Sequence, residues 1–378
     1  MNLTKKILKE MLEINSTKHR EGEIGKYIMS LFYNKGYTIQ AFDVPILNQE
    51  TINKSCNESF NRKNIWIAKG NPKLFFFGHQ DTVKPDKELY SENEIPKVVE
   101  SDGKIYGLGS VDMKGGIAAF IAATLECNPE NIGLVFTCDE EYEFEGIKNF
   151  TKSDLLKDYF PKLVVFAEPT DLEIVNKHRA CYEFHIKVKG ESAHAAKPEL
   201  GRDASKLYLA LCETRRELMS NYPGSNLNIG QFISGNNETI NKVSVCADAD
   251  IDVRPSDELY SKGPDHILNI IRKNVSDQNL ITEKTSININ APPLNTPLIE
   301  LKILEKIVSD TGINTKFSEL IGTSEAGYIS TKYNFSCVNF GPGPQIMSHK
   351  EGEYVSLDSL EKCLKVYINL IEKYDNHL

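Results

Sequence analysis

Acidic and histidine side chains recur where short apolar runs of this sequence end. The runs and the residues that follow them are LFFF before His79 and Asp81, IGLVFT before Glu140 and Glu141, LVVFA before Glu168, and VNF ahead of His349, with Asp112 in the turn-rich segment GLGSVDMKGG. Imidazole and carboxylate groups that meet at one edge of a sheet suit a borderline divalent metal such as zinc. A single histidine or acidic turn is usually an ordinary surface feature. The recurrence at successive strand ends is what favours a metal centre.

The order of residues within two of these segments adds detail. In an extended segment, residues i and i+2 point the same way, so the Asp81 carboxylate is expected to accept the second ring N–H of His79. A carboxylate in that position commonly orients a metal-bound imidazole. Glu140 and Glu141 are neighbours and should point apart, so that one binds metal while the other faces the substrate.

The apolar runs themselves predict the elements that position these side chains. Within the first 175 residues we expect strands at 74–77, 132–137 and 163–167 and a buried helix at 117–125. Strands that alternate with helices predict an α/β layer with a mainly parallel sheet flanked by helices, whose chemistry gathers at the carboxyl ends of the strands. The polar stretch 48–63 is expected to be a surface loop.

The pattern changes near residue 180. Tyr182–Val188 alternates strictly between apolar and polar residues, as a half-exposed strand should. The elements expected after it are a helix at 203–218, strands at 227–233 and 243–253, a helix at 265–274 and a strand at 285–289. This is the β-α-β-β-α-β order of a split-βαβ, ferredoxin-like α+β domain. We therefore expect a catalytic domain of residues 1–177 and 292–378, interrupted by an inserted domain of residues 178–291. Helices near 298–310 and 357–374 and a strand near 338–340 complete the first domain.

Composition excludes several classes of protein. The 378 residues include 44 Lys and Arg against 53 Asp and Glu, a net charge of −9, which argues against nucleic acid or an anionic membrane as a partner. The longest nearly apolar run, 117–125, is about half of what a bilayer-spanning helix needs. Eight cysteines without a C-x-x-C pair predict reduced thiols, and we expect a cytoplasmic protein.

Six blocks occur in an order that resembles a known family. The blocks are GHQDTV, GLGSVDMKGG, DEE, AEPT, SAHAAKP and GPGP…SH. They resemble those of the co-catalytic zinc amidohydrolases and peptidases, which include acetylornithine deacetylase, succinyl-diaminopimelate desuccinylase, aminoacylase and the glutamate carboxypeptidases. The resemblance covers essentially the whole chain. GKIYGLGSVDMKGG and the ending from His349 to Glu353 look most like the acetylornithine deacetylase branch.

The resemblance implies a site with two zinc ions per chain, for which cobalt or manganese would also suit the ligands. It implies His79 and Glu168 on one metal, Glu141 and His349 on the other, Asp112 bridging both, and a cis peptide bond between Asp112 and Met113. Glu140 would be the general base that takes a proton from the attacking water and returns it to the leaving amine. Asp81 would orient His79.

The resemblance also assigns roles outside the metal ligands. The family histidine that matches His194 reaches the active site of the other subunit and stabilises the oxyanion, which implies a homodimer formed through the inserted domain. Asn241 and Arg254 match substrate contacts, and Gly322-Thr323-Ser324 looks like the family loop near the substrate carboxylate. Glu325-Ala326-Gly327 follows, where the desuccinylase branch has an Asp and then an Arg.

The predicted function is hydrolysis of the amide bond of an N-acyl amino acid, with N-acetylornithine or a relative as the first candidate. Desuccinylation of succinyl-diaminopimelate and aminopeptidase action on small peptides remain alternatives, and the missing Arg at position 327 weighs against the first of these. A catalytically dead binding protein would be expected to have lost Glu140 or a ligand. A dehydrogenase is excluded because Asp112 stands where a dinucleotide fingerprint needs its third glycine.

Overall fold

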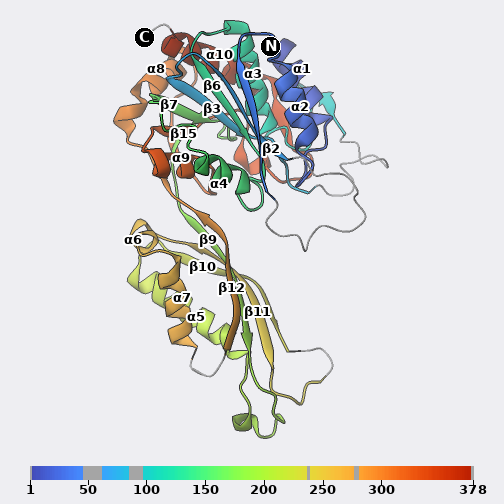
Figure 1. Cartoon of the computed structure of the whole chain (residues 1–378), viewed down its shortest axis with the longest axis vertical. Helices are drawn as coiled ribbons and strands as arrows, with labels where there is room; N and C mark the ends of the chain where they lie inside the picture. The colour runs from blue at the N-terminus through green and yellow to red at the C-terminus, as the bar shows by residue number, and fades with distance from the viewer. Residues whose placement is uncertain (1, 46–61, 85–96, 236–238, 276–280, 376–378) are drawn as a thin grey trace. The chain divides into compact units, whose positions relative to one another are not determined.

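The computed structural model describes residues 2–45, 62–84, 97–235, 239–275 and 281–375 (Figure 1). The chain divides into two compact units, Met1–His178 with Leu294–Leu378 and, between them, Arg179–Pro293. The boundaries expected from the sequence, 177/178 and 291/292, lie beside these positions. Most of the predicted surface loop, residues 48–61, falls outside the described residues.

In its described residues, the first unit is built on a sheet of nine strands. They are β1 (Thr38–Asp43), β2 (Lys63–Lys69), β3 (Leu74–His79), β6 (Ile132–Thr137), β7 (Leu163–Phe166), β8 (Ile174–His178), β13 (Leu294–Asn295), β14 (Phe317–Leu320) and β15 (Cys337–Asn339). The order is β1-β2-β6-β3-β7-β15-β8-β13, with β14 pairing with β8. The central run β6-β3-β7-β15 is parallel, and β1, β2 and β13 add antiparallel edges. This confirms the expected α/β fold with a mainly parallel sheet.

Helices cover both faces of this sheet (Figure 1). One face carries α1 (Asn2–Leu12), α2 (Gly22–Ser30), α3 (Lys114–Cys127), α8 (Lys302–Asp310) and α10 (Leu357–Asp375), and the other carries α4 (Glu145–Lys152) and α9 (Ala326–Tyr333). A separate small sheet joins β4 (Val99–Ser101), β5 (Lys104–Tyr106) and β16 (Tyr354–Ser356). Short 3-10 turns, η4 (Leu298–Leu301) and η5 (Gln345–Met347), precede α8 and the His349 loop.

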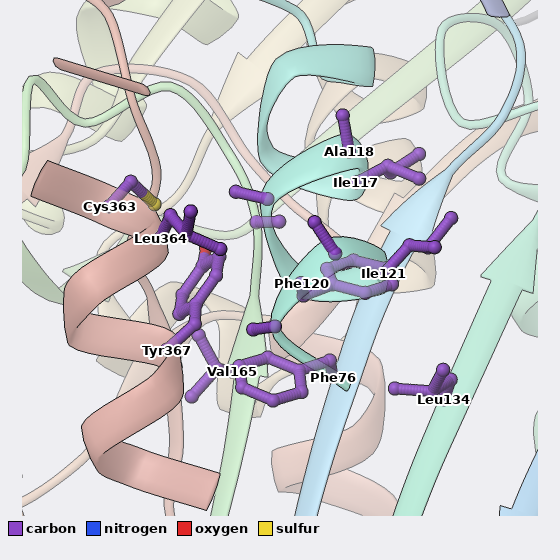
Figure 2. Close-up of a cluster of buried hydrophobic side chains, with 14 of the residues drawn as sticks. Phe76, Ile117, Ala118, Phe120, Ile121, Leu134, Val165, Cys363, Leu364 and Tyr367 are labelled. Atoms are coloured by element: carbon purple, nitrogen blue, oxygen red, sulfur yellow. The ribbon is translucent and has the colours of Figure 1, made fainter. Parts of the chain in front are cut away.

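The core of the first unit shows why the central strands are apolar throughout. Phe76 on β3 stacks against Phe120 of α3, with ring centroids 5.5 Å apart, and meets Tyr367 of α10 at 4.8 Å (Figure 2). Its neighbour Phe77 points to the opposite face and packs against Phe150 of α4. A parallel strand buried on both faces needs apolar residues at every position, since alternate side chains point to opposite sides.

The second unit has the predicted β-α-β-β-α-β order. Its elements are β9 (Cys181–Lys189), η3 (Pro198–Leu200), α5 (Lys206–Asn221), β10 (Asn226–Ser234), β11 (Cys246–Arg254), α6 (Asp257–Ser261), α7 (Pro264–Asn274) and β12 (Ile281–Ala291). The sheet order is β10-β11-β9-β12, and every neighbouring pair is antiparallel. The alternation in β9 marks one buried face and one more exposed face, as expected. The buried face, which packs in the core with the helices, consists of Tyr182, Phe184, Ile186 and Val188.

Several element boundaries differ from the sequence prediction by a few residues. The helix expected at 203–218 runs from Lys206 to Asn221, and the strand expected from Val243 begins at Cys246, because the Val243 N–H bonds to the Ala193 carbonyl in a separate bridge. The end of the predicted surface loop was wrong: Arg62 is 3% exposed and Lys63 begins β2. Among the described residues, no helix combines the length and apolar character needed to cross a bilayer.

Candidate metal centre

Three parallel neighbouring strands deliver their polar side chains to one edge of the sheet. His79 is the last residue of β3 and is fully buried, the turn carrying Glu140 and Glu141 follows β6, and Glu168 comes two residues after β7. Because β6, β3 and β7 are adjacent and parallel, their carboxyl ends meet at the same place.

Five side chains from separate parts of the chain gather there. Two groups have ligand atoms that all lie within 4.8 Å of one another: His79 with Asp112 and Glu168, and Asp112 with Glu141 and His349. His79 Nε2 lies 3.1 Å from Asp112 Oδ1, while His349 Nε2 lies 2.8 Å from Glu141 Oε2 and 3.5 Å from Asp112 Oδ2. Asp112 therefore belongs to both groups, in the position that a bridging ligand needs.

Glu140 lies at this centre without belonging to either group. Its Oε2 is 4.0 Å from His79 Nε2, and its side chain is 11% exposed. The neighbouring Glu141 side chain is 5% exposed and is hydrogen-bonded to His349. The two adjacent glutamates thus contact different partners. Glu141 belongs to the group of Asp112 and His349, whereas the Glu140 carboxylate belongs to neither group.

The predicted contact between Asp81 and His79 needs a correction. His79 Nδ1 lies 3.1 Å from the backbone carbonyl of Asp81, whereas the nearer carboxylate oxygen is 3.7 Å away. The Asp81 carboxylate instead accepts the backbone N–H groups of Glu140, at 3.2 Å, and Glu141, at 3.1 Å. Residue spacing correctly predicted that Asp81 and His79 are neighbours. The backbone N–H groups of the turn after β6 compete for the Asp81 carboxylate, and the sequence around Asp81 gives no sign of them.

Electrostatics of the centre reflect several carboxylates packed together out of water. Burial, with added repulsion from the Asp112 carboxylate, raises the pKa of Glu141 to about 7 and that of Glu168 to about 8, and burial raises the pKa of Glu140 well above its usual value. Burial acts in the same direction on Asp112, but hydrogen bonds from His349 and His79 outweigh it and hold that pKa well below its ordinary range. Hydrogen bonds to Asp112 and Glu141 raise the pKa of His349 to about 10.

These donors fit a pair of divalent cations. Four buried carboxyl groups repel one another, and within the described residues the ion pairs of Asp112 and Glu141 are to histidines rather than to lysine or arginine. Two divalent ions would supply positive charge that offsets the repulsion between the carboxylates. The carboxylate and imidazole ligands are of the types that zinc prefers. The peptide bond between Asp112 and Met113 is cis.

The predicted substrate loop of the first unit lies between β14 and α9. Gly322 and Thr323 lead into Ser324, which is fully buried. The Ser324 hydroxyl donates to Asn339 Oδ1 at 3.0 Å and accepts the Ala326 N–H at 3.3 Å. Ser324 thus anchors the loop and the start of α9, and a substrate contact from this loop would have to come mainly from its neighbours.

The remaining predicted residues belong to the second unit. His194 forms a bridge with Lys242, its Nδ1 accepts the Ala196 N–H at 3.1 Å, and the Ala195 N–H donates to the Asn241 carbonyl at 2.9 Å. The segments that carry His194 and Asn241 are therefore side by side.

Arg254, at the end of β11, already has an acidic partner. Its Nε and Nη2 donate to the Asp252 carboxylate at 2.8 to 3.1 Å. The fork predicted to hold a substrate carboxylate is thus engaged within its own strand.

Sequence reasoning missed several residues around the centre. Thr137 Oγ1 donates to the fully buried Glu325 at 2.6 Å, beside His79 and Glu168, and burial raises the pKa of Glu325 to about 8. Asn64 donates to the Gly146 carbonyl at 2.7 Å and accepts the Cys138 N–H, which fixes both ends of the turn after β6. Glu325 stood within a quoted motif, whereas no sequence signal marked Asn64.

An α/β sheet that gathers two histidines and several carboxylates at its carboxyl edge, with a further glutamate beside them, defines a metal-dependent hydrolase. The chain belongs to the peptidase family M20/M25/M40, whose model matches residues 75–373. It is 29% identical over 383 residues to a probable carboxypeptidase of Paracoccidioides brasiliensis, covering 95% of this chain and 83% of the relative.

Solved structures share the fold. A tripeptidase from Staphylococcus aureus superposes with a TM-score of 0.78 at 19% identity, covering 100% of this chain and 99% of that one. A dinuclear metal-binding peptidase of the M20 family from Bacillus subtilis gives 0.67 at 13% identity, covering 99% and 98%. The family and fold confirm the predicted class of enzyme, while the expected closeness to acetylornithine deacetylase is not confirmed.

Proposed function

We propose that this protein hydrolyses the amide bond between an acyl group and the nitrogen of an amino acid that keeps its free α-carboxylate. The observation that carries the proposal is the position of Glu140 beside two ligand groups that share Asp112. This bond is common to N-acyl amino acids and to the C-terminal residue of a peptide. The proposed activity therefore includes the predicted deacetylation of N-acetylornithine. It also agrees with the name of the relative in Paracoccidioides brasiliensis, a probable carboxypeptidase.

The residues divide the chemistry between them. Two zinc ions held by His79, Asp112, Glu141, Glu168 and His349 would polarise the amide carbonyl and lower the pKa of a water. Glu140 accepts the proton of that water and passes it to the leaving nitrogen, so that a carboxylate and a free amine result. Asp81 fixes the backbone from which Glu140 projects.

Aminopeptidase action on tripeptides is the second candidate, supported by the tripeptidase from Staphylococcus aureus with its TM-score of 0.78. A side-by-side assay separates the two. The zinc-loaded protein is offered N-acetylornithine, N-acyl dipeptides, succinyl-diaminopimelate and tripeptides with a free amino terminus, and the released amine is measured. Release from N-acetylornithine, N-acyl dipeptides or succinyl-diaminopimelate supports the proposal and identifies the acyl group, release from tripeptides alone supports the second candidate, and no release from any of them contradicts both.

The metal content is tested on the same preparation. Chelation should abolish amide hydrolysis, and titration with zinc should restore it at about two ions per chain. Cobalt and manganese are the comparison ions. Restoration that saturates at one ion per chain would contradict a dinuclear centre that uses both ligand groups.

We also propose a homodimer formed through the second unit, with His194 acting in the partner's site. Exposed apolar side chains on α5 and β10 support it: Leu209 is 65% exposed, Ile233 is 55% exposed, and the half-exposed Tyr208 packs against Phe232. Two inactive variants, Glu140→Gln and His194→Ala, are unfolded together, refolded and assayed. If His194 acts across the interface, about one quarter of parental activity returns, because half of the dimers are mixed and each carries one intact site. No recovery in mixed dimers shows that His194 acts within its own chain, and parental activity of His194→Ala by itself shows that His194 has no part in catalysis.

A further inference from the structure

The segment Gly107–Asp112 forms a tight loop between β5 and α3, and it ends at the residue shared by both ligand groups. Within it, the Ser110 N–H donates to the Gly107 carbonyl at 3.0 Å, and the Lys114 N–H donates to the Gly109 carbonyl at 2.9 Å. Gly109 has φ +78°, and a Cβ at this position would come within 2.6 Å of a side-chain carbon of Thr82. The loop is therefore compact, and its N–H groups turn inward rather than toward solvent.

One buried carboxylate receives these N–H groups. Glu353 is 3% exposed. Its Oε2 accepts the Gly109 N–H at 2.9 Å, and its Oε1 accepts the N–H groups of Val111 at 2.8 Å and Asp112 at 3.1 Å. Its backbone carbonyl accepts a fourth, from Gly107, at 3.1 Å. Both side-chain oxygens and the backbone carbonyl of Glu353 accept N–H groups of this loop, so Glu353 fixes the loop from inside.

Glu353 lies close in the chain to both His349 and a strand of the small sheet. It follows His349 by four residues and directly precedes β16, whose Tyr354 pairs with Tyr106 of β5. The small sheet therefore holds the main chain of Glu353 against the start of the Gly107–Asp112 loop. One short segment supplies His349 to the second ligand group and, through Glu353, holds the backbone of Asp112 in that group.

We propose that Glu353 is a positioning residue of the metal centre, which sets Asp112 relative to His349 before any metal binds. Glu353 belongs to neither ligand group and acts through the backbone N–H of Asp112. The proposal rests on the metal pair of the proposed function, though not on its substrate. Asp81 does the same for the turn of Glu140 and Glu141, so each half of the centre has a buried carboxylate that binds backbone N–H groups.

Two variants test this role. Glu353→Gln keeps one oxygen acceptor but turns an NH₂ group toward backbone N–H groups, and Glu353→Ala leaves all three side-chain acceptor bonds unmade. Glu305→Gln on the exposed face of α8 is the matched control. The metal-free proteins are titrated with zinc by calorimetry, and hydrogen exchange is followed in the peptide that contains residues 107–112.

We expect Glu353→Gln to weaken zinc binding about 10- to 100-fold, as the loss of partners behind metal ligands does, and to speed exchange in residues 107–112, while the control matches the parent. Glu353→Ala should show larger effects, and if it does not fold, Glu353→Gln alone decides. A lower melting temperature with parental zinc affinity and parental exchange would overturn the proposal. A parent that binds two zinc ions but hydrolyses no amide would instead refute the proposed function and leave this role intact.

Discussion

Arg62 and Asp139 form a buried ion pair behind the turn that carries Glu140 and Glu141. Arg62 Nη1 lies 2.9 Å from Asp139 Oδ1, and the two side chains are 2% and 0% exposed. The second oxygen of Asp139 accepts the Glu145 N–H at 3.2 Å, so the pair holds the turn from Asp139 to the start of α4. Removing either partner should therefore disturb both the stability of the first unit and the position of the general base.

The structure sets the size of the effect. Arg62 also donates to the carbonyls of Val44 and Pro45, at 3.3 and 2.8 Å, so Arg62→Met loses these bonds and leaves Asp139 without its cation. An isolated charge in place of a buried pair costs about 3–5 kcal/mol of unfolding free energy. Asp139→Asn keeps a residue that tolerates the left-handed φ of +65° and should cost a similar amount through the unpaired Arg62. The double variant leaves no lone charge. We therefore expect it to lose less unfolding free energy than the two single variants together, by about 2 kcal/mol or more.

The loss of unfolding free energy caused by Arg62→Met should depend on pH. Burial raises the pKa of Asp139 to about 6 even with Arg62 beside it, and removing the cation raises it further. The folded variant then holds a proton that the unfolded chain releases, so its stability falls as pH rises through this range. We expect a smaller loss at about pH 5 than at about pH 8.

The assay uses the single tryptophan of the chain. Trp66 lies on β2 in the first unit and is 3% exposed, so its fluorescence during urea unfolding reports that unit alone. This matters because two compact units need not unfold together. Lys306→Met, which breaks the exposed Lys306–Asp310 pair, is the control and should change little. Single losses below about 1 kcal/mol that add in the double variant would refute the argument.

Three further predictions follow from single residues. Glu140→Gln should bind the same amount of zinc as the parent but lose about 10²- to 10⁴-fold in kcat, measured as amine release; unchanged kcat would remove Glu140 as the base. Glu21 is fully buried and burial raises its pKa to about 8, so the folded state keeps a proton that the unfolded chain releases above its usual pKa, and stability falls with rising pH. The difference in unfolding free energy, Glu21→Gln minus parent, should therefore rise by about 1.4 kcal/mol per pH unit between about pH 5.5 and about pH 7.5, and a flat difference would contradict this. Phe76→Ala, which removes a ring between Phe120 and Tyr367, should cost about 3–5 kcal/mol by urea unfolding, and a loss under about 1 kcal/mol would show that the core refills the space.

Periodicity alone predicted most of the central elements, because their burial leaves a plain record in the sequence. The strand 132–137 was predicted with its observed bounds, and the alternation in Tyr182–Val188 identified β9 and its buried face. The edge strands β1 and β2 and the small β4–β5–β16 sheet were not predicted. The strands β1, β4, β5 and β16 are partly exposed or few in residues, so neither an apolar run nor a clear alternation marks them. β2 is different: it is buried from Asn64 to Ala68, and its apolar run IWIA was missed.

The residue types of the candidate site could be predicted because chemistry restricts them. Carboxylates and imidazoles at successive strand ends have few explanations other than a metal centre, and the structure brings His79, Asp112, Glu141, Glu168 and His349 together. Their assignment as metal ligands, and the roles of His194, Asn241 and Arg254, stay predictions. The acyl group and the amine of the substrate left no comparable pattern.

The sequence by itself determined which side chains are available for chemistry and the order of the elements that carry them, because both are local properties of the chain. Only the tertiary structure decided which backbone groups those side chains hold. Arg62 looked like part of a polar loop and proved to be a buried partner of Asp139. The Asp81 carboxylate was expected on an imidazole and proved to bind the N–H groups of Glu140 and Glu141. Such partners are set by packing between segments far apart in the chain, and no local pattern records them.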